Sequence, residues 1–191
     1  MLKTNPVQVR AATAKDAQRI AEIHVSGWKA AYRGVVPDPH LEGLSVDQRR
    51  LYWSSGIASG EATVRVTEGS EGVSGWIAFG RCRDPAAVAS AGEIWAIYVS
   101  PDLLGRGIGQ ELLNRALDEL RAGGFASVSL WVLAKNERAC RFYSAMGFEL
   151  DTSSTKTVEI GGRHWKRCAM SGVLPVDDSF EADAICRGSE R

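Results

Sequence analysis

Three glycines at alternate positions, Gly105, Gly107 and Gly109, form the part of this sequence best suited to binding a ligand. An apolar run rich in β-branched and aromatic residues precedes them at residues 94–99, and a helical pattern of apolar residues follows from Ile108. A strand, a glycine-rich turn and a helix present unpaired N–H groups at the first helical turn, where the helix dipole favours negative charge. Glycine lets a phosphate oxygen approach the main chain because it has no Cβ. The pattern therefore predicts a site for a phosphorylated ligand.

The residues around these glycines do not fit two common phosphate-binding loops. A nucleoside triphosphate loop needs Gly-Lys-Ser/Thr, whereas Ile108 and Gln110 follow the second and third glycines. A dinucleotide fingerprint needs G-x-G-x-x-G with an acidic residue about twenty positions further on, where this chain has Ser127 and Val128. Taken alone, the G-x-G-x-G string is also compatible with a surface turn before an amphipathic helix.

A second block, at residues 127–148, has the pattern of another strand followed by a helix. Residues 127–133 alternate as in a half-buried strand. Asn136 is a favourable N-cap residue, and Gly147 is placed to end the helix that follows. The string from Asn136 to Phe148 reads N-x-x-A-x-x-F-Y-x-x-x-G-F.

Together the two blocks resemble motifs A and B of the GCN5-related N-acetyltransferase (GNAT) superfamily, in the expected order and at the expected distance. Motif A is R/Q-x-x-G-x-G/A after a strand that ends Val-x-Pro, and motif B is the string that begins at Asn136. The resemblance covers residues 7–171. It implies that acetyl-coenzyme A is the cosubstrate, with its pyrophosphate on the loop amides. Leu104 replaces the usual Gln or Arg of motif A, which removes one polar contact and leaves the main-chain donors unaffected.

The resemblance also implies how the rest of the cosubstrate binds. The strand at residues 94–99 would pair with the pantetheine arm, and the next strand would splay away to leave room. Ile97 matches the amide that polarises the thioester carbonyl, although core packing is an equally good account of its side chain. The residues expected to contact the cosubstrate are Ile97, Tyr98, Val99, Leu104, Gly105, Arg106, Gly107, Ile108, Gly109, Gln110, Asn136 and Tyr143.

Three residues match catalytic positions of the superfamily. Tyr143 matches the tyrosine that protonates the departing thiolate, and a tyrosine pKa near 10 suits a thiolate near 8.5. Asn136, two turns earlier and roughly 10 Å away along the helix, matches the asparagine that contacts pantetheine or holds a water. Glu93 matches the general base of the histone-acetylating branch. The simpler alternatives are a buried aromatic residue, a helix cap and a solvated strand end, respectively.

The acceptor pocket is expected to lie between the first helices and the last hairpin. Aromatic residues there would suit an aliphatic or cationic amine, and the six tryptophans are many for this length. For each tryptophan taken singly, core packing is the better account. The residues expected to contact the acceptor are Trp28, Tyr32, Trp76 and Trp95.

The elements that must position these residues follow from hydrophobic period and turn signals. Their order, β-α-α(α)-β-β-β-α-β-α-β-β, is the one that the superfamily implies. The fold class expected is α/β with a mixed, twisted central sheet of about seven strands and helices on both faces, the GNAT-type acyl-CoA N-acyltransferase fold. Outside the two motif blocks, we expect strands at residues 7–10, 62–68, 72–82, 149–158 and 163–171, and helices beginning after Thr13 and after Ser45.

Length and composition narrow the function classes. The 191 residues fit one domain, expected at 1–172, followed by a loosely ordered tail at 173–191. Basic and acidic residues number 23 each, so no net field recruits nucleic acid or an anionic membrane. The four cysteines have no metal-site or disulfide spacing, and no segment is apolar over a membrane-spanning length. We therefore expect a cytoplasmic protein without a metal.

The function expected is an acetyl-CoA-dependent N-acetyltransferase acting on a primary amine by direct attack in a ternary complex. A small molecule, a protein N-terminus and a lysine are all open as acceptors, and so is a homodimer. The alternative from another class is a coenzyme-A-binding regulatory module without catalysis. Glu93, Asn136 and Tyr143 together argue against that alternative, since a sensor needs only the phosphate cradle.

Overall fold

The computed structural model describes residues 8–69 and 72–174 of the chain. Its strands are β1 (Gln8–Ala11), β2 (Thr63–Gly69), β3 (Gly72–Arg81), β4 (Ala91–Val99), β5 (Ser127–Leu133), β6 (Glu149–Ile160) and β7 (Arg163–Val173). Its α-helices are α1 (Ala17–Tyr32), α2 (Asp38–Glu42), α3 (Val46–Ser59), α4 (Ile108–Ala122) and α5 (Glu137–Ala145). Short 3₁₀ turns precede α1 and follow β4.

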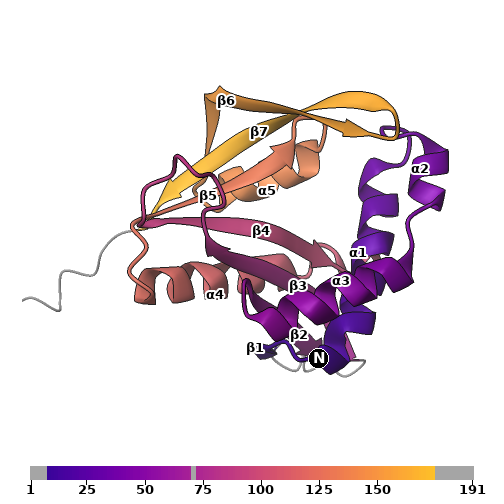
Figure 1. Cartoon of the computed structure of the whole chain (residues 1–191), viewed down its shortest axis with the longest axis horizontal. Coiled ribbons are helices and arrows are strands. Elements are labelled where there is room, and N and C mark those ends of the chain that lie inside the picture. Colours follow the sequence, from indigo (N-terminus) through magenta and orange to yellow (C-terminus); the bar gives the residue numbers. More distant parts are fainter. Residues whose placement is uncertain (1–7, 70–71, 175–191) are drawn as a thin grey trace, which may run out of the picture.

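The seven strands form one mixed sheet in the order β1-β2-β3-β4-β5-β7-β6 (Figure 1). Among these strands β4 and β5 are the parallel pair, joined by a crossover through α4, and the other neighbours are antiparallel. This arrangement confirms the α/β fold class with a mixed sheet of about seven strands.

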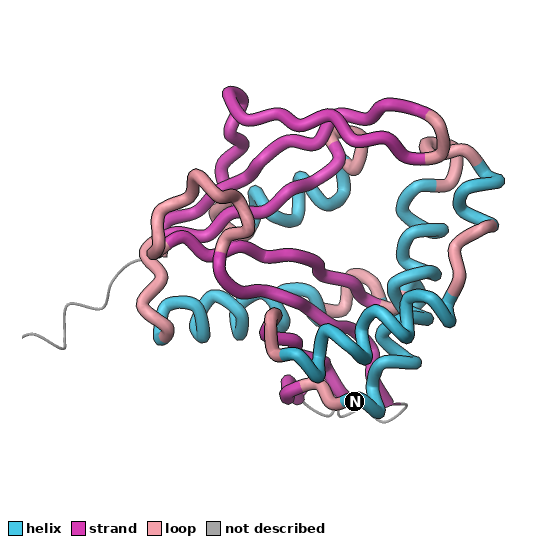
Figure 2. The backbone as a smooth tube through the Cα atoms, in the orientation of Figure 1, coloured by secondary structure: helices cyan, strands magenta, loops and turns pink. Residues whose placement is uncertain are grey.

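Helices cover both faces of the sheet (Figure 2). On one face α4 and α5 pack against a core that includes Ile94, Leu112 and Leu130. On the other face α1 and α3 pack against a second core that includes Ile20 and Trp76. Burial of these two apolar faces is the main force holding the layers together. Within the described residues, no helix has the length and apolarity needed to cross a membrane.

The local signals in the sequence correspond to the ends of the helices. The Ser45 hydroxyl accepts a hydrogen bond from the amide of Gln48, and the Asn136 side chain accepts one from Ala139 at 3.1 Å, so both predicted N-caps are confirmed. Gly147 follows α5 with a φ of 85°, a conformation that favours glycine.

The described residues end close to the predicted limits of the first and last strands. The predicted first strand at 7–10 is observed from Gln8 to Ala11, and Val7 lies outside the described residues. At the other end β7 continues to Val173, and Leu174 is buried in the core of α4 and α5. Of the tail predicted at 173–191, residues 175–191 lie outside the described residues, so the domain boundary near 172 stays a prediction.

An extra residue in β4 sets the geometry of the centre of the sheet. Ala78 of β3 pairs with Ala96 and Phe79 pairs with Ile94, so Trp95 has no partner and forms a β-bulge. A bulge bends its strand, and the parallel pairing of β4 with β5 ends at the pair of Ile94 and Leu130. Beyond that point β4 continues to Val99, and no described strand pairs with it on its β5 side. The sheet is therefore open there.

Candidate active site

A cavity of about 890 Å³ lies where β4 and β5 separate. Its walls come from α1, α3, the second half of β4, the loop before α4, the end of β5, α5 and the final hairpin. The volume is in the range of small-molecule and cofactor sites. It brings together residues that are far apart in the sequence, and the glycine loop forms one end of it.

The glycine loop has the conformation that an anion site requires. Gly105 and Gly107 have φ values of 79° and 83°, and a Cβ added to either would meet no atom within 4 Å. The first backbone hydrogen bond of α4 runs from Glu111 to the carbonyl of Gly107. The amides of residues 108–110 precede it, and no acceptor for them is found within the described part of the chain. Free N–H groups beside open space fit the pyrophosphate of coenzyme A.

The open edge of β4 fits the other half of such a ligand. Ile97, Tyr98 and Val99 line the cavity, and the backbone groups of β4 that face the β5 side beyond Ile94 have no strand partner among the described residues. An extended amide-containing chain can add to a strand edge of this kind through main-chain hydrogen bonds. The loop residues Leu104, Gly109 and Gln110 also line the cavity, whereas the Arg106 side chain is not part of its wall.

Tyr143 and Asn136 reach the same cavity from α5. Tyr143 is 8% exposed, and burial raises the pKa of its hydroxyl above the usual value near 10. Asn136 caps α5 through its side-chain oxygen and donates a hydrogen bond from Nδ2 to the hydroxyl of Tyr32 at 3.2 Å. The structure thus places the predicted proton donor on the cavity wall and ties α5 to α1.

Glu93 is arranged differently from a base that faces a substrate. Its carboxylate is buried, 3% exposed, and is not part of the cavity wall. It accepts hydrogen bonds from the Arg83 amide at 2.9 Å and from both ends of the Arg83 guanidinium. A carboxylate with these partners has few lone pairs free for an amine or a water. The base role of Glu93 therefore stays a prediction, and any proton relay has to pass Arg83.

Three of the four predicted acceptor contacts lie on the cavity wall: Trp28, Tyr32 and Trp95. Trp28 donates a hydrogen bond from Nε1 to the Tyr98 hydroxyl at 2.6 Å. The fourth, Trp76, does not line the cavity, which corrects the prediction for this residue. It is fully buried in the core of α1 and α3 and stacks on Tyr98 with ring centroids 5.1 Å apart. It supports the wall from behind because the register of β3 turns its side chain into that core.

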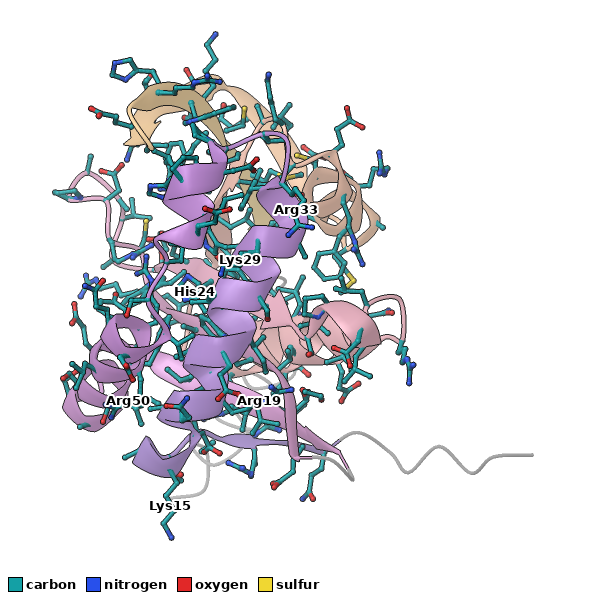
Figure 3. The ribbon with its side chains drawn as sticks, turned by 90° about the vertical axis from the view of Figure 1, so that its right-hand side faces the viewer. Lys15, Arg19, His24, Lys29, Arg33 and Arg50 are labelled. Atoms are coloured by element: carbon teal, nitrogen blue, oxygen red, sulfur yellow. The ribbon has the colours of Figure 1, made fainter. Side chains whose placement is uncertain are left out.

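His24 is a residue of the cavity to which the sequence assigned no role. His24 lies midway along α1 (Figure 3) and lines the cavity. Trp53 donates its Nε1 hydrogen to His24 Nδ1 at 3.2 Å, so the neutral imidazole must carry its hydrogen on Nε2. Burial lowers its pKa to about 3, with the charge of Arg49 as a second cause. His24 is thus a neutral hydrogen-bond donor. The sequence did not reveal this because its partner Trp53 is 29 residues away, on α3.

Arginines are the second group that the sequence did not single out. Arg49, Arg83, Arg138 and Arg167 all line the cavity. The Arg83 guanidinium also lies over the Trp95 ring, 4.6 Å from its centroid. The four arginines come from α3, the loop after β3, α5 and β7. No sequence motif contains more than one of them, so no local signal could have grouped them.

Comparisons with known proteins agree with this geometry. The sequence model of the acetyltransferase (GNAT) family matches residues 28–148. The N-acetyltransferase YuaI of Bacillus subtilis is 31% identical over 139 residues, which make up 73% of this chain and 78% of YuaI. The L-amino acid N-acyltransferase MnaT of Escherichia coli is 26% identical over 180 residues, 94% of this chain and 99% of that protein.

Two solved structures share the fold. The PaiA N-acetyltransferase of Thermoplasma acidophilum, in complex with coenzyme A, superposes with a TM-score of 0.72 at 17% identity, covering 88% of this chain and 99% of the other. A phosphinothricin acetyltransferase of Sinorhizobium meliloti, in complex with acetyl-CoA, gives 0.68 at 25% identity and covers 89% of each chain. With the family model matched across both motif blocks, this chain belongs to the acetyltransferase (GNAT) family.

Proposed function

We propose that this protein transfers the acetyl group of acetyl-CoA to the primary amine of a small molecule. The observation that carries the proposal is that Tyr143, the free edge of β4 and the loop amides line one cavity. The names of relatives such as MnaT and the acetyl-CoA complex of the Sinorhizobium meliloti enzyme support the reaction class. The cavity volume of about 890 Å³ is in the range of small-molecule and cofactor sites, which supports a small acceptor over a protein N-terminus or lysine.

Binding and alignment are the first contributions of the chain. The amides of residues 108–110 hold the pyrophosphate, and the edge of β4 holds the pantetheine arm as an added strand. The amide of Ile97 donates to the thioester oxygen, which gains negative charge as the amine attacks. Fixing both substrates in one cavity converts a bimolecular encounter into a reaction between aligned groups.

The chemistry is then one bond formed and one broken. The amine nitrogen attacks the thioester carbonyl carbon, the carbon–sulfur bond breaks, and the leaving thiolate takes a proton from the Tyr143 hydroxyl. The nitrogen loses one proton to water, from which Tyr143 is reprotonated. The products are the N-acetylated amine and coenzyme A. Because burial raises the pKa of Tyr143, this hydroxyl holds its proton until the thiolate forms.

We assign Glu93 a narrower role than that of direct base. Its carboxylate fixes the Arg83 guanidinium, which in turn lies against the cavity and over Trp95. Asn136 likewise acts on position, because its two side-chain groups are engaged by the Ala139 amide and the Tyr32 hydroxyl. Contact of Asn136 with the pantetheine arm remains part of the proposal.

A thiol-release assay with acetyl-CoA and a panel of amines tests the function. The panel contains small amines, peptides with free N-termini and lysine peptides, and mass spectrometry identifies the acetylated product. We expect thiol release matched by acetylation of small amines. If calorimetry detects acetyl-CoA binding but no amine in the panel is acetylated, the non-catalytic regulatory module is the better account.

A further inference from the structure

The cavity carries a positive charge that the composition of the chain conceals. Four arginines line it, and no aspartate or glutamate of the described residues does. The whole chain has 23 basic and 23 acidic residues, so the excess is local. A cavity wall that has arginines and no carboxylates repels polycationic acceptors and attracts anionic groups.

The arginines divide between the two sides of the sheet. Arg138 lies on α5, on the side of the glycine loop. On β7, Met170 pairs with Leu130 and both are buried against α4 and α5, whereas Ala169 pairs with Trp131. Because side chains alternate along a strand, Arg167 shares the face of Ala169. This face points away from α4, and the phosphates are expected at the N-terminus of α4.

Arg49 approaches the same region from α3. Burial raises the pKa of the Tyr98 hydroxyl, and the charges of Arg49 and Arg167 both oppose that rise. Arg49 and Arg167 line the same cavity as Tyr98, whose ring packs with the core of α1 and α3. Tyr98 follows Ile97 directly in β4, so this region adjoins the expected position of the thioester.

Of the three arginines other than Arg138, two lack an anionic partner in the described part of the chain. Arg83 is paired with Glu93, but the side chains of Arg49 and Arg167 make no ion pair or hydrogen bond with any described residue. Burial, with the charge of Arg83 as a second cause, lowers the pKa of Arg167. A half-buried, unpaired guanidinium is costly in the free protein, and a carboxylate or similar oxyanion would offset that cost with two parallel hydrogen bonds.

We propose that the acceptor is a small amino acid whose carboxylate binds to Arg49 and Arg167 while its amine lies at the edge of β4 beside Ile97. This inference rests on the proposed function and adds the substrate class to it. The apolar part of the acceptor contacts the aromatic wall formed by His24, Tyr52 and Trp53. Arg83, fixed by Glu93, adds positive charge at the rim.

The experiment compares L-phenylalanine, L-methionine and L-leucine with their amides and their decarboxylated amines. We expect the parent to prefer the acids by at least about tenfold in kcat/KM, the effect of one charge-assisted contact. Arg167→Met should lower the ratio of acid to amide by about tenfold, mainly through KM, and the double variant with Arg49→Met should bring it near one. The pKa of the amine differs between each acid and its amide. This difference cancels when the acid-to-amide ratio of kcat/KM in a variant is divided by that ratio in the parent.

Matched controls separate this site from general charge effects. Lys166→Met removes the exposed cation beside Arg167, on the other face of β7. Arg50→Met removes the neighbour of Arg49; Arg50, labelled in Figure 3, pairs with Asp47 and does not line the cavity. Both controls should keep the preference for acids, and Arg167→Lys should restore part of it. Calorimetry should give the same acetyl-CoA affinity for all variants.

Each remaining outcome is decisive. An acid-to-amide ratio that is the same in the parent, in Arg167→Met and in the double variant overturns the inference and leaves the acetyltransferase function intact. A fall in acetyl-CoA affinity in Arg167→Met without a change in acid preference also overturns it, because the arginines then serve the cosubstrate. If no amine is acetylated, the proposed function fails, and tryptophan fluorescence titration of the coenzyme A complex with acids and amides decides the anion site. Tighter binding of acids that the two arginine variants lose supports the site, and equal binding overturns it.

Discussion

The Arg83 guanidinium holds the Glu93 carboxylate across the connection between β3 and β4. Glu93 Oε2 accepts from Arg83 Nε at 3.2 Å and from the Arg83 amide at 2.9 Å, while Oε1 accepts from Nη2. The carboxylate is buried and the guanidinium is half exposed toward the cavity. The pair therefore presents an arginine, and not a carboxylate, to a bound acceptor.

Glu93→Gln should lower kcat/KM by less than about tenfold, and by the same factor at every pH between 6 and 10. The reason is that the amide still accepts one bond from Arg83 but no longer fixes it through two oxygens. Steady-state kinetics across this range measure it, with Glu119→Gln as the control because Glu119 bridges Arg65 and Arg115 outside the cavity. A loss that is large at low pH and recovers at high pH would instead establish Glu93 as the base.

Tyr143→Phe should lower kcat by about 100-fold, the lower end of general-acid effects, with acetyl-CoA affinity nearly unchanged. Only the hydroxyl is removed, and the aromatic packing on Phe142 and Phe148 is kept. Since burial raises the Tyr143 pKa above its usual value near 10, the parent should show no loss of the acid form below pH 10. Full activity in the phenylalanine variant would mean that water protonates the thiolate.

Gly107→Val should reduce acetyl-CoA affinity by at least about 100-fold. The φ of 83° at Gly107 is unfavourable for a β-branched residue, and the open space beside it is where the phosphate binds. Gly124→Val is the matched control, because Gly124 has a φ of 80° and equally open surroundings at the other end of α4. Calorimetry should show the loss of affinity in the first variant alone, while thermal unfolding reports comparable strain in both. Unchanged affinity in a folded Gly107→Val protein would remove the loop from the binding site.

His24 should stay neutral between pH 8 and pH 5, with its hydrogen on Nε2. Its pKa in the folded protein is about 3, against 6.5 for the free side chain, so the unfolded chain binds a proton at His24 that the folded chain does not. The free energy of unfolding should therefore fall by about 2 kcal/mol from pH 8 to pH 5 through this group. Nitrogen-15 NMR of the imidazole checks the tautomer, and His24→Gln should flatten the pH dependence of denaturant unfolding. A His24 resonance that titrates near pH 6.5 would contradict the arrangement with Trp53.

The parts of the site that depend on neighbours in the chain could be predicted from the sequence. The glycine loop and the Asn136 cap are set by backbone freedom and by hydrogen bonds within a few residues, so their residue types reveal them. Because these local features lie in two motif blocks, they were also enough to indicate the GNAT family and its sheet. Tyr143 was found for the same reason, since its position in the helix of the second block fixes its side.

The acceptor side was decided only by tertiary structure. Trp76 and Trp95 look alike in sequence, but the bulge at Trp95 leaves one on the cavity and the register of β3 buries the other. Arg49 and Arg167 line the same cavity although they lie on α3 and β7, elements that are far apart in the chain. Charge and exposure at such a site depend on which elements meet there, so the sequence by itself determined the family and the phosphate end of the cavity, and the tertiary structure determined the charge that faces the acceptor.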